Sequence, residues 1–201
     1  MNDATDDGET ASDGPTAVLR EDPALGSLVA THGPVTVDPH ENPFERLLVS
    51  IVRQQVSMDA AASIRECLFD RVDPTPAEIR AVEVDALRAA GLSRAKAEYA
   101  KNFARAWEEG DWSRDHFQAM DDEDVVSTLT AVRGIGPWTA KMFLLFGLGR
   151  EDVFPVEDLG IRKAMRSVVD PDLDRSGMRA VARRWRPYRS YASLYLWRAI
   201  D

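Results

Sequence analysis

One stretch decides how this chain is expected to fold: Val132-Arg133-Gly134-Ile135-Gly136-Pro137-Trp138-Thr139-Ala140. A helix with one apolar face ends at a Gly-x-Gly turn. A second, apolar helix then begins at Pro137, a residue type that favours the first helical position. Twenty residues after Trp138, Asp158 stands at the head of a further helix, within Phe154-Pro155-Val156-Glu157-Asp158-Leu159. We therefore predict two packed helices joined by a tight turn, followed at a set spacing by a carboxylate.

The turn has the composition of a phosphate-binding loop. Gly134 and Gly136 permit positive φ and allow another backbone to come close. The free amides at the start of the second helix coincide with the positive end of its dipole. Arg133 before the turn, Thr139 after it and Lys141, which we expect on the exposed side, add hydrogen-bond donors. A lone Gly-x-Gly is more often an ordinary turn between helices, but this context favours phosphate binding.

Composition restricts the class of protein. The 201 residues can bury one sizeable core or two small lobes. We find no apolar run long enough to span a bilayer and no signal segment, so we expect a soluble protein in the cytoplasm. Cys67 is the single cysteine, which excludes an internal disulfide and a multi-cysteine iron–sulfur or zinc site.

Charge is distributed unevenly along the chain. The formal net charge is −9, made up of −8 in residues 1–42, −6 in residues 43–132 and +5 in residues 133–201. A positive segment that begins at the turn indicates a surface that faces a polyanion. Only four of the 25 basic residues are lysines, and this acidic, lysine-poor composition resembles that of proteins from salt-loving organisms.

The apolar pattern predicts an all-α fold. Residues 1–15 are acidic and polar, and we expect them to be a disordered tail. Helical spacing follows from about residue 16 to the end, with a short helix at 24–31, a strong one from Pro43 and the hairpin at about 125–148. Only Val35-Thr36-Val37 alternates as a strand would. We predict about ten helices in two lobes with a cleft between them.

Several motifs together resemble one family. The hairpin and the 154–159 segment resemble those of the helix-hairpin-helix (HhH-GPD) DNA glycosylase superfamily. The 184–197 tail and the 51–57 and 91–96 segments are similar to its 3-methyladenine DNA glycosylase II (alkylbase) branch. The resemblance covers residues 24–200 and leaves no room for the β-rich N-terminal domain that some members carry. It implies a compact, monomeric base-excision-repair enzyme that acts on double-stranded DNA with damaged bases, near the nucleoid of a prokaryotic cell.

Asp158 matches the family's catalytic aspartate. Cleavage of an N-glycosidic bond passes through an oxocarbenium-like sugar, which a carboxylate stabilises while it orients water. The neighbouring Glu157 is the competing candidate, and Asp158 could instead serve only as a helix cap. Members that also cut the backbone carry a nucleophilic lysine where this chain has Trp138. Lys141 matches no lysine of the pattern, so water is the expected nucleophile.

Aromatic side chains are candidates for a pocket that holds the damaged base. An alkylated purine is positively charged, so the faces of Trp138, Trp197 and Tyr191 would attract it. Gln55, at a joint between two helices, matches the side chain that fills the gap when the nucleotide is flipped out. A plain joint residue is the alternative.

The hairpin itself also carries implied contacts. The resemblance places Arg133, Gly134, Ile135 and Gly136 against the DNA backbone. The carbonyls of Thr130, Val132 and Ile135 match a site for a monovalent ion or magnesium, although no cofactor is required for the reaction.

The sequence leaves two other functions open. The lesion could be hypoxanthine, uracil or oxidised guanine, or the chain could be a DNA-binding module without catalysis. A binding module needs neither Asp158 nor the two tryptophans. A metal-dependent nuclease is disfavoured because the histidines are scattered.

Overall fold

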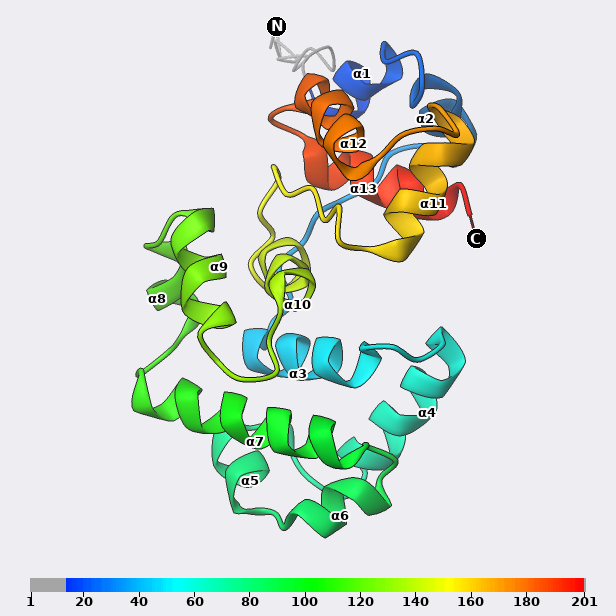
Figure 1. Cartoon of the computed structure of the whole chain (residues 1–201). Helices are drawn as coiled ribbons and strands as arrows, with labels where there is room; N and C mark the ends of the chain where they lie inside the picture. Colours follow the sequence, from blue (N-terminus) through cyan, green and yellow to red (C-terminus); the bar gives the residue numbers. More distant parts are fainter. Residues whose placement is uncertain (1–13, 201) are drawn as a thin grey trace, which may run out of the picture.

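The computed structural model describes residues 14–200, which form two helical lobes (Figure 1). Within this range the chain contains α-helices, one π-helical segment (η1), one 3-10 turn (η2) and no strand. Their bounds are α1 Pro15–Arg20, α2 Gly26–His32, α3 Pro43–Arg53, α4 Met58–Phe69, α5 Pro76–Ala81, α6 Val84–Ala89, α7 Arg94–Glu109, α8 Arg114–Gln118, α9 Asp122–Thr130, α10 Pro137–Met142, η1 Phe143–Gly147, α11 Leu159–Val168, α12 Arg175–Ala182, η2 Arg183–Trp185 and α13 Arg189–Arg198.

One lobe is assembled from the middle of the chain, α3 to η1. Its core is aromatic: Phe44 stacks on Phe103 with ring centroids 4.8 Å apart, and Trp107 packs edge-on against both rings. The apolar spacing that predicts the helix from Pro43 is the buried face of α3. Trp107 and Trp112 are thus part of this core and its margin.

The other lobe joins the two ends of the described chain. Helices α1 and α2 pack against α11 to α13 around Trp185, which is fully buried (Figure 1). Trp197 and Leu194 of α13 pack against both cores. The chain passes between the lobes through residues 33–42 and 148–158, so the predicted carboxylate segment lies at the junction.

The all-helical, two-lobed prediction is confirmed, with differences in detail. Val35-Thr36-Val37 forms no strand, because Val35 instead packs into the second core as part of an extended linker. The predicted helix at 24–31 is displaced to Gly26–His32, and α1 begins at Pro15 inside the predicted tail. The rest of that tail, residues 1–13, lies outside the described residues.

Candidate active site and DNA-binding hairpin

The two glycines of the hairpin serve different purposes. Gly134 has φ 104°, and a Cβ added there would lie 2.1 Å from Cγ of Tyr99, so packing against α7 requires glycine. Gly136 has an ordinary negative φ, and a Cβ added there would meet nothing within 4 Å. Of the two positions, only Gly136 leaves open space at the beginning of α10. This is the position that a DNA backbone could approach.

The side chains expected to help the turn bind phosphate divide into two groups. Arg133 is exposed and has no ion-pair partner among residues 14–200. Ile135 is buried in the core, so only its backbone is available to a ligand. The expectation that Lys141 lies on the exposed side is wrong, because its side chain is only 23% exposed. Thr139 is 2% exposed and accepts a hydrogen bond from Gln54, and Lys141 turns toward the carboxylate segment.

Three N–H groups from three helices converge on Asp158. At the start of α11 its Oδ1 accepts a hydrogen bond from the amide of Ile161 at 2.9 Å, as a helix cap does. The indole Nε1 of Trp197 donates to the same oxygen at 3.0 Å. Nε1 of Trp138 donates to Oδ2 at 2.7 Å. Capping and the predicted site therefore coincide, and the two tryptophans fix both oxygens of the carboxylate.

Glu157 is occupied by cations. Its carboxylate accepts hydrogen bonds from Nζ of Lys141 at 2.8 and 3.1 Å, and Nη2 of Arg179 lies 3.6 Å away. Lys141 also donates to the carbonyl of Phe154. One turn of α10 thus anchors the carboxylate segment twice, through Trp138 to Asp158 and through Lys141 to Glu157. Glu157 has the partners of a structural ion pair.

Trp197, Phe146 and Arg46 form a row of stacked side chains. The sequence does not suggest this row. The ring of Trp197 stacks on Phe146 with centroids 5.7 Å apart and an interplanar angle of 28°. The guanidinium of Arg46 lies 4.6 Å from the centroid of Phe146. Burial, followed by the nearby charge of Arg53, lowers the pKa of Arg46 to about 10, so Arg46 is still charged at neutral pH. The row links α3 to the Asp158 corner, which is the group formed by Asp158, Trp138 and Trp197.

Tyr191 is not part of the Asp158 corner. Its hydroxyl donates to Oε1 of Glu151 at 2.6 Å, and its ring packs edge-on against Tyr188. Burial, the hydrogen bond and the charge of Glu151 raise the pKa of Tyr191 to about 12. It precedes Trp197 by six residues, roughly 9 Å along the axis of α13. The structure offers no contact that places Tyr191 with the two tryptophans.

The joint between α3 and α4 carries the remaining predicted residue. Gln55 is exposed and has φ 55°, a left-handed conformation that few side chains adopt without support. Beside it, Val56 and Met58 are exposed apolar side chains. The preceding Gln54, which the sequence does not single out, bonds to the hairpin.

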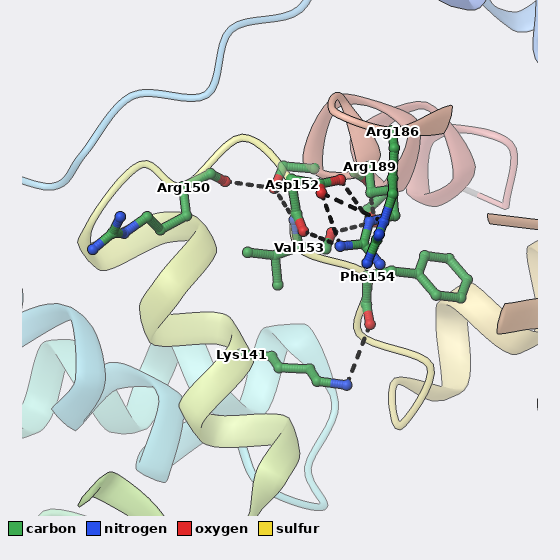
Figure 2. Close-up of polar contacts among 9 residues, drawn as sticks. Lys141, Arg150, Asp152, Val153, Phe154, Arg186 and Arg189 are labelled. Carbon is green, nitrogen blue, oxygen red and sulfur yellow. Dashed lines mark hydrogen bonds and ion pairs between the residues drawn. The ribbon is translucent and has the colours of Figure 1, made fainter. Parts of the chain in front are cut away.

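A cavity of about 380 Å³ opens between the lobes next to Lys141. Val126, Leu144 and Phe154 give it an apolar lining, and Asp152 and Arg189 form an ion pair at its edge. Figure 2 shows Lys141 reaching from α10 toward Phe154, with Arg186 and Arg189 gathered on Asp152. Asp158 and the two tryptophans do not line this cavity.

The positive charge of residues 133–201 is partly neutralised by ion pairs with acidic side chains of the same chain. Six of its thirteen basic side chains form ion pairs: Lys141, Arg150, Arg179, Arg184, Arg186 and Arg189. Over residues 14–200, no group of three or more His, Cys, Asp or Glu side chains is placed to hold a metal ion. No helix in the same range combines the length and apolar character that a membrane span requires.

Residues 48–187 match the family of HhH-GPD superfamily base excision DNA repair proteins. The chain belongs to this family. It is 32% identical over 189 residues to a putative DNA-3-methyladenine glycosylase of Bacillus subtilis, covering 89% of this chain and 66% of that protein. The chain thus spans just under two thirds of the length of this relative.

Two solved structures of the family share the fold closely. The Schizosaccharomyces pombe 3-methyladenine DNA glycosylase in complex with abasic DNA has a TM-score of 0.84 at 29% identity, covering 92% of this chain and 95% of that one. A DNA-3-methyladenine glycosidase from Bacillus halodurans has a TM-score of 0.78 at 32% identity, covering 94% and 90%.

Proposed function

We propose that this chain is a monofunctional DNA glycosylase that removes alkylated purines from double-stranded DNA during base excision repair. The observation that carries the proposal is the carboxylate of Asp158, fixed by the two indole N–H groups and the amide of Ile161. A protein that only binds DNA has no use for such an arrangement. Similar proteins that are named 3-methyladenine glycosylases, one of them as putative, support the same reaction.

The reaction that fits this site is hydrolysis of the N-glycosidic bond. The bond between C1′ of the deoxyribose and the base breaks, and the base leaves with the electron pair. Asp158 stabilises the positive charge that develops on the sugar and orients a water molecule. The oxygen of that water bonds to C1′, one water proton is released, and an abasic site remains. An alkylated purine leaves easily because it already carries positive charge.

Water is the proposed nucleophile because the side chain that donates to Oδ2 of Asp158 from α10 is the indole of Trp138, which is not a nucleophilic amine. Trp138 occupies the position where lyase-type members carry a lysine. The amine of Lys141 is held by Glu157 and by the carbonyl of Phe154. A Schiff base would require Lys141 to leave both partners. The enzyme should therefore produce abasic sites without cutting the backbone.

The DNA contacts follow from the hairpin and the α3–α4 joint. The backbone at Gly134, Ile135 and Gly136 would hold a phosphate, with Arg133 as an exposed cation. Gln55 would fill the gap left by the flipped nucleotide, and its exposure and φ of 55° support that role. The faces of Trp138 and Trp197 would contact the base.

Hairpin carbonyls supply the oxygen ligands that a monovalent cation or magnesium accepts. The carbonyl of Val132 already accepts a hydrogen bond from the amide of Ile135. Over residues 14–200, the carbonyls of Thr130 and Ile135 have no hydrogen-bond partner. These groups fit a bound ion, which would neutralise phosphate charge there. We further propose a monomer that works without other cofactors, in the cytoplasm of a prokaryotic cell near the nucleoid.

A lesion panel tests the proposal. Duplexes bearing 3-methyladenine, 7-methylguanine, hypoxanthine, uracil or 8-oxoguanine are incubated with the protein at several salt concentrations and then divided, one half receiving alkali. We expect strand breaks in the duplexes with methylated purines, only after alkali. Breaks without alkali would contradict hydrolysis by water. Preferred cleavage of uracil or 8-oxoguanine would contradict the substrate class.

A further inference from the structure

A single side chain connects the α3–α4 joint to the hairpin. Nε2 of Gln54 donates hydrogen bonds to the carbonyl of Gly134 and to Oγ1 of Thr139, both at 3.0 Å. These partners lie 80 and 85 residues further along the chain. They flank the turn on both sides, one in the loop and one in the first turn of α10.

The bond is specific for an amide. The carbonyl of Gly134 can only accept, so it fixes the orientation of the Gln54 amide with nitrogen toward the hairpin. The NH₂ group has two protons and serves both acceptors. A leucine would donate to neither, and asparagine would be shorter by one methylene. A glutamate would direct oxygen at a carbonyl.

Gln54 also ends α3 immediately before Gln55, whose backbone is in the left-handed conformation. The backbone of Gln54 forms the C-cap of α3, and Gln55 follows with φ 55°. Two residues before Gln54, the carbonyl of Val52 accepts a hydrogen bond from Nζ of Lys96 at 2.8 Å. A left-handed conformation at a residue other than glycine persists when the surroundings determine it. Lys96 and Gln54 supply those constraints, and Gln54 also bonds the joint to the hairpin.

We propose that Gln54 is a positioning residue that sets Gln55 at a fixed distance from the phosphate-binding turn. The inference rests on the proposed function, in which the turn holds the DNA backbone and Gln55 enters the duplex. Separation of the two contacts by a fixed span allows binding energy at the turn to drive Gln55 into the base stack. Gln54 therefore matters when a duplex must be opened, and little when the lesion is already unpaired.

The test compares duplex with single-stranded DNA of the same sequence, each carrying the preferred lesion, under single-turnover conditions. We expect Gln54→Leu to lower the excision rate on duplex about tenfold, because two hydrogen bonds are lost. On single strands the rate should change less than about twofold. Fluorescence of 2-aminopurine next to the lesion should show reduced flipping. Thermal unfolding of each variant checks that the fold is retained.

A double-mutant cycle shows whether Gln54 acts through Gln55. If both singles lose about tenfold on duplex, Gln54→Leu combined with Gln55→Ala should lose about tenfold, not about a hundredfold. Thr139→Val, which removes one of the two acceptors, should cost about threefold in the wild-type background and nothing with Gln54→Leu. Thr139→Val keeps the test informative if Gln54→Leu fails to fold.

Two results would overturn the role of Gln54: wild-type excision by Gln54→Leu on duplex, or losses that are additive with Gln55→Ala. A wild-type protein that excises no lesion would instead refute the proposed function. The two failures are therefore distinguishable.

Discussion

Glu157 and Asp158 are neighbours in the chain, yet their carboxylates have opposite electrostatic surroundings. Glu157 is paired with Lys141 at 2.8 Å and approached by Arg179 at 3.6 Å. Asp158 accepts hydrogen bonds from neutral N–H groups alone, and among residues 14–200 it forms no ion pair. Neutral donors orient a carboxylate without cancelling its charge. Asp158 is therefore left able to stabilise a transient cation, and Glu157 is not.

The first prediction separates catalysis from binding at Asp158. Asp158→Asn keeps the shape of the side chain but removes its charge, so excision of the preferred lesion should fall about a thousandfold. Affinity for an undamaged duplex should stay the same or increase, because a negative charge near the phosphates is lost. Single-turnover excision and a fluorescence-anisotropy titration measure the two quantities. A parallel loss of affinity and rate would mean that Asp158 has a structural role only.

The second prediction concerns the two indole donors. Trp138→Phe and Trp197→Phe each keep an aromatic face but remove one hydrogen bond to a charged group, so each should lower the excision rate about tenfold to thirtyfold. Tyr191→Phe is the matched control, because its hydroxyl bonds Glu151, and it should stay within about threefold. Equal losses from all three variants would show that the rate does not depend specifically on the indole donors to Asp158.

The third prediction addresses the ion pair of Glu157. Lys141→Met leaves a partly buried carboxylate with only a distant arginine, which should lower the free energy of unfolding by about 2 kcal/mol. Excision per folded molecule should change less than about threefold. Arg94→Met removes the exposed pair with Glu98 and should cost less than about 0.5 kcal/mol. Denaturant titrations provide both values, and a large loss of rate with unchanged stability would assign Lys141 to catalysis.

Local patterns were sufficient for the architecture and for the centre of the site. Helical periodicity, Pro43 and Pro137 at helix starts, and the Gly-x-Gly turn are properties of short segments, and they are where the prediction and the structure agree. Asp158 could be found in the same way, since it caps the helix that follows it.

Contacts between distant segments could not be predicted. The partners of Lys141 and Thr139 lie 16 and 85 residues away, and nothing near either residue indicates that it turns inward. Arg46 and Phe146 meet only because α3 packs against η1. Tyr191 is a candidate for the base pocket only because it is aromatic, and the sequence gives no sign that its hydroxyl bonds Glu151.

Asp158, and not the neighbouring Glu157, is proposed to perform the chemistry. The most direct measurement is the single-turnover rate at which alkali-sensitive sites form in a duplex carrying a methylated purine, compared for Asp158→Asn and Glu157→Gln under conditions where both variants are folded. We predict that Glu157→Gln stays within about tenfold of wild type, while Asp158→Asn falls about a thousandfold. Equal rates for the two variants, or a greater loss in Glu157→Gln, would contradict the assignment of Asp158 as the catalytic carboxylate.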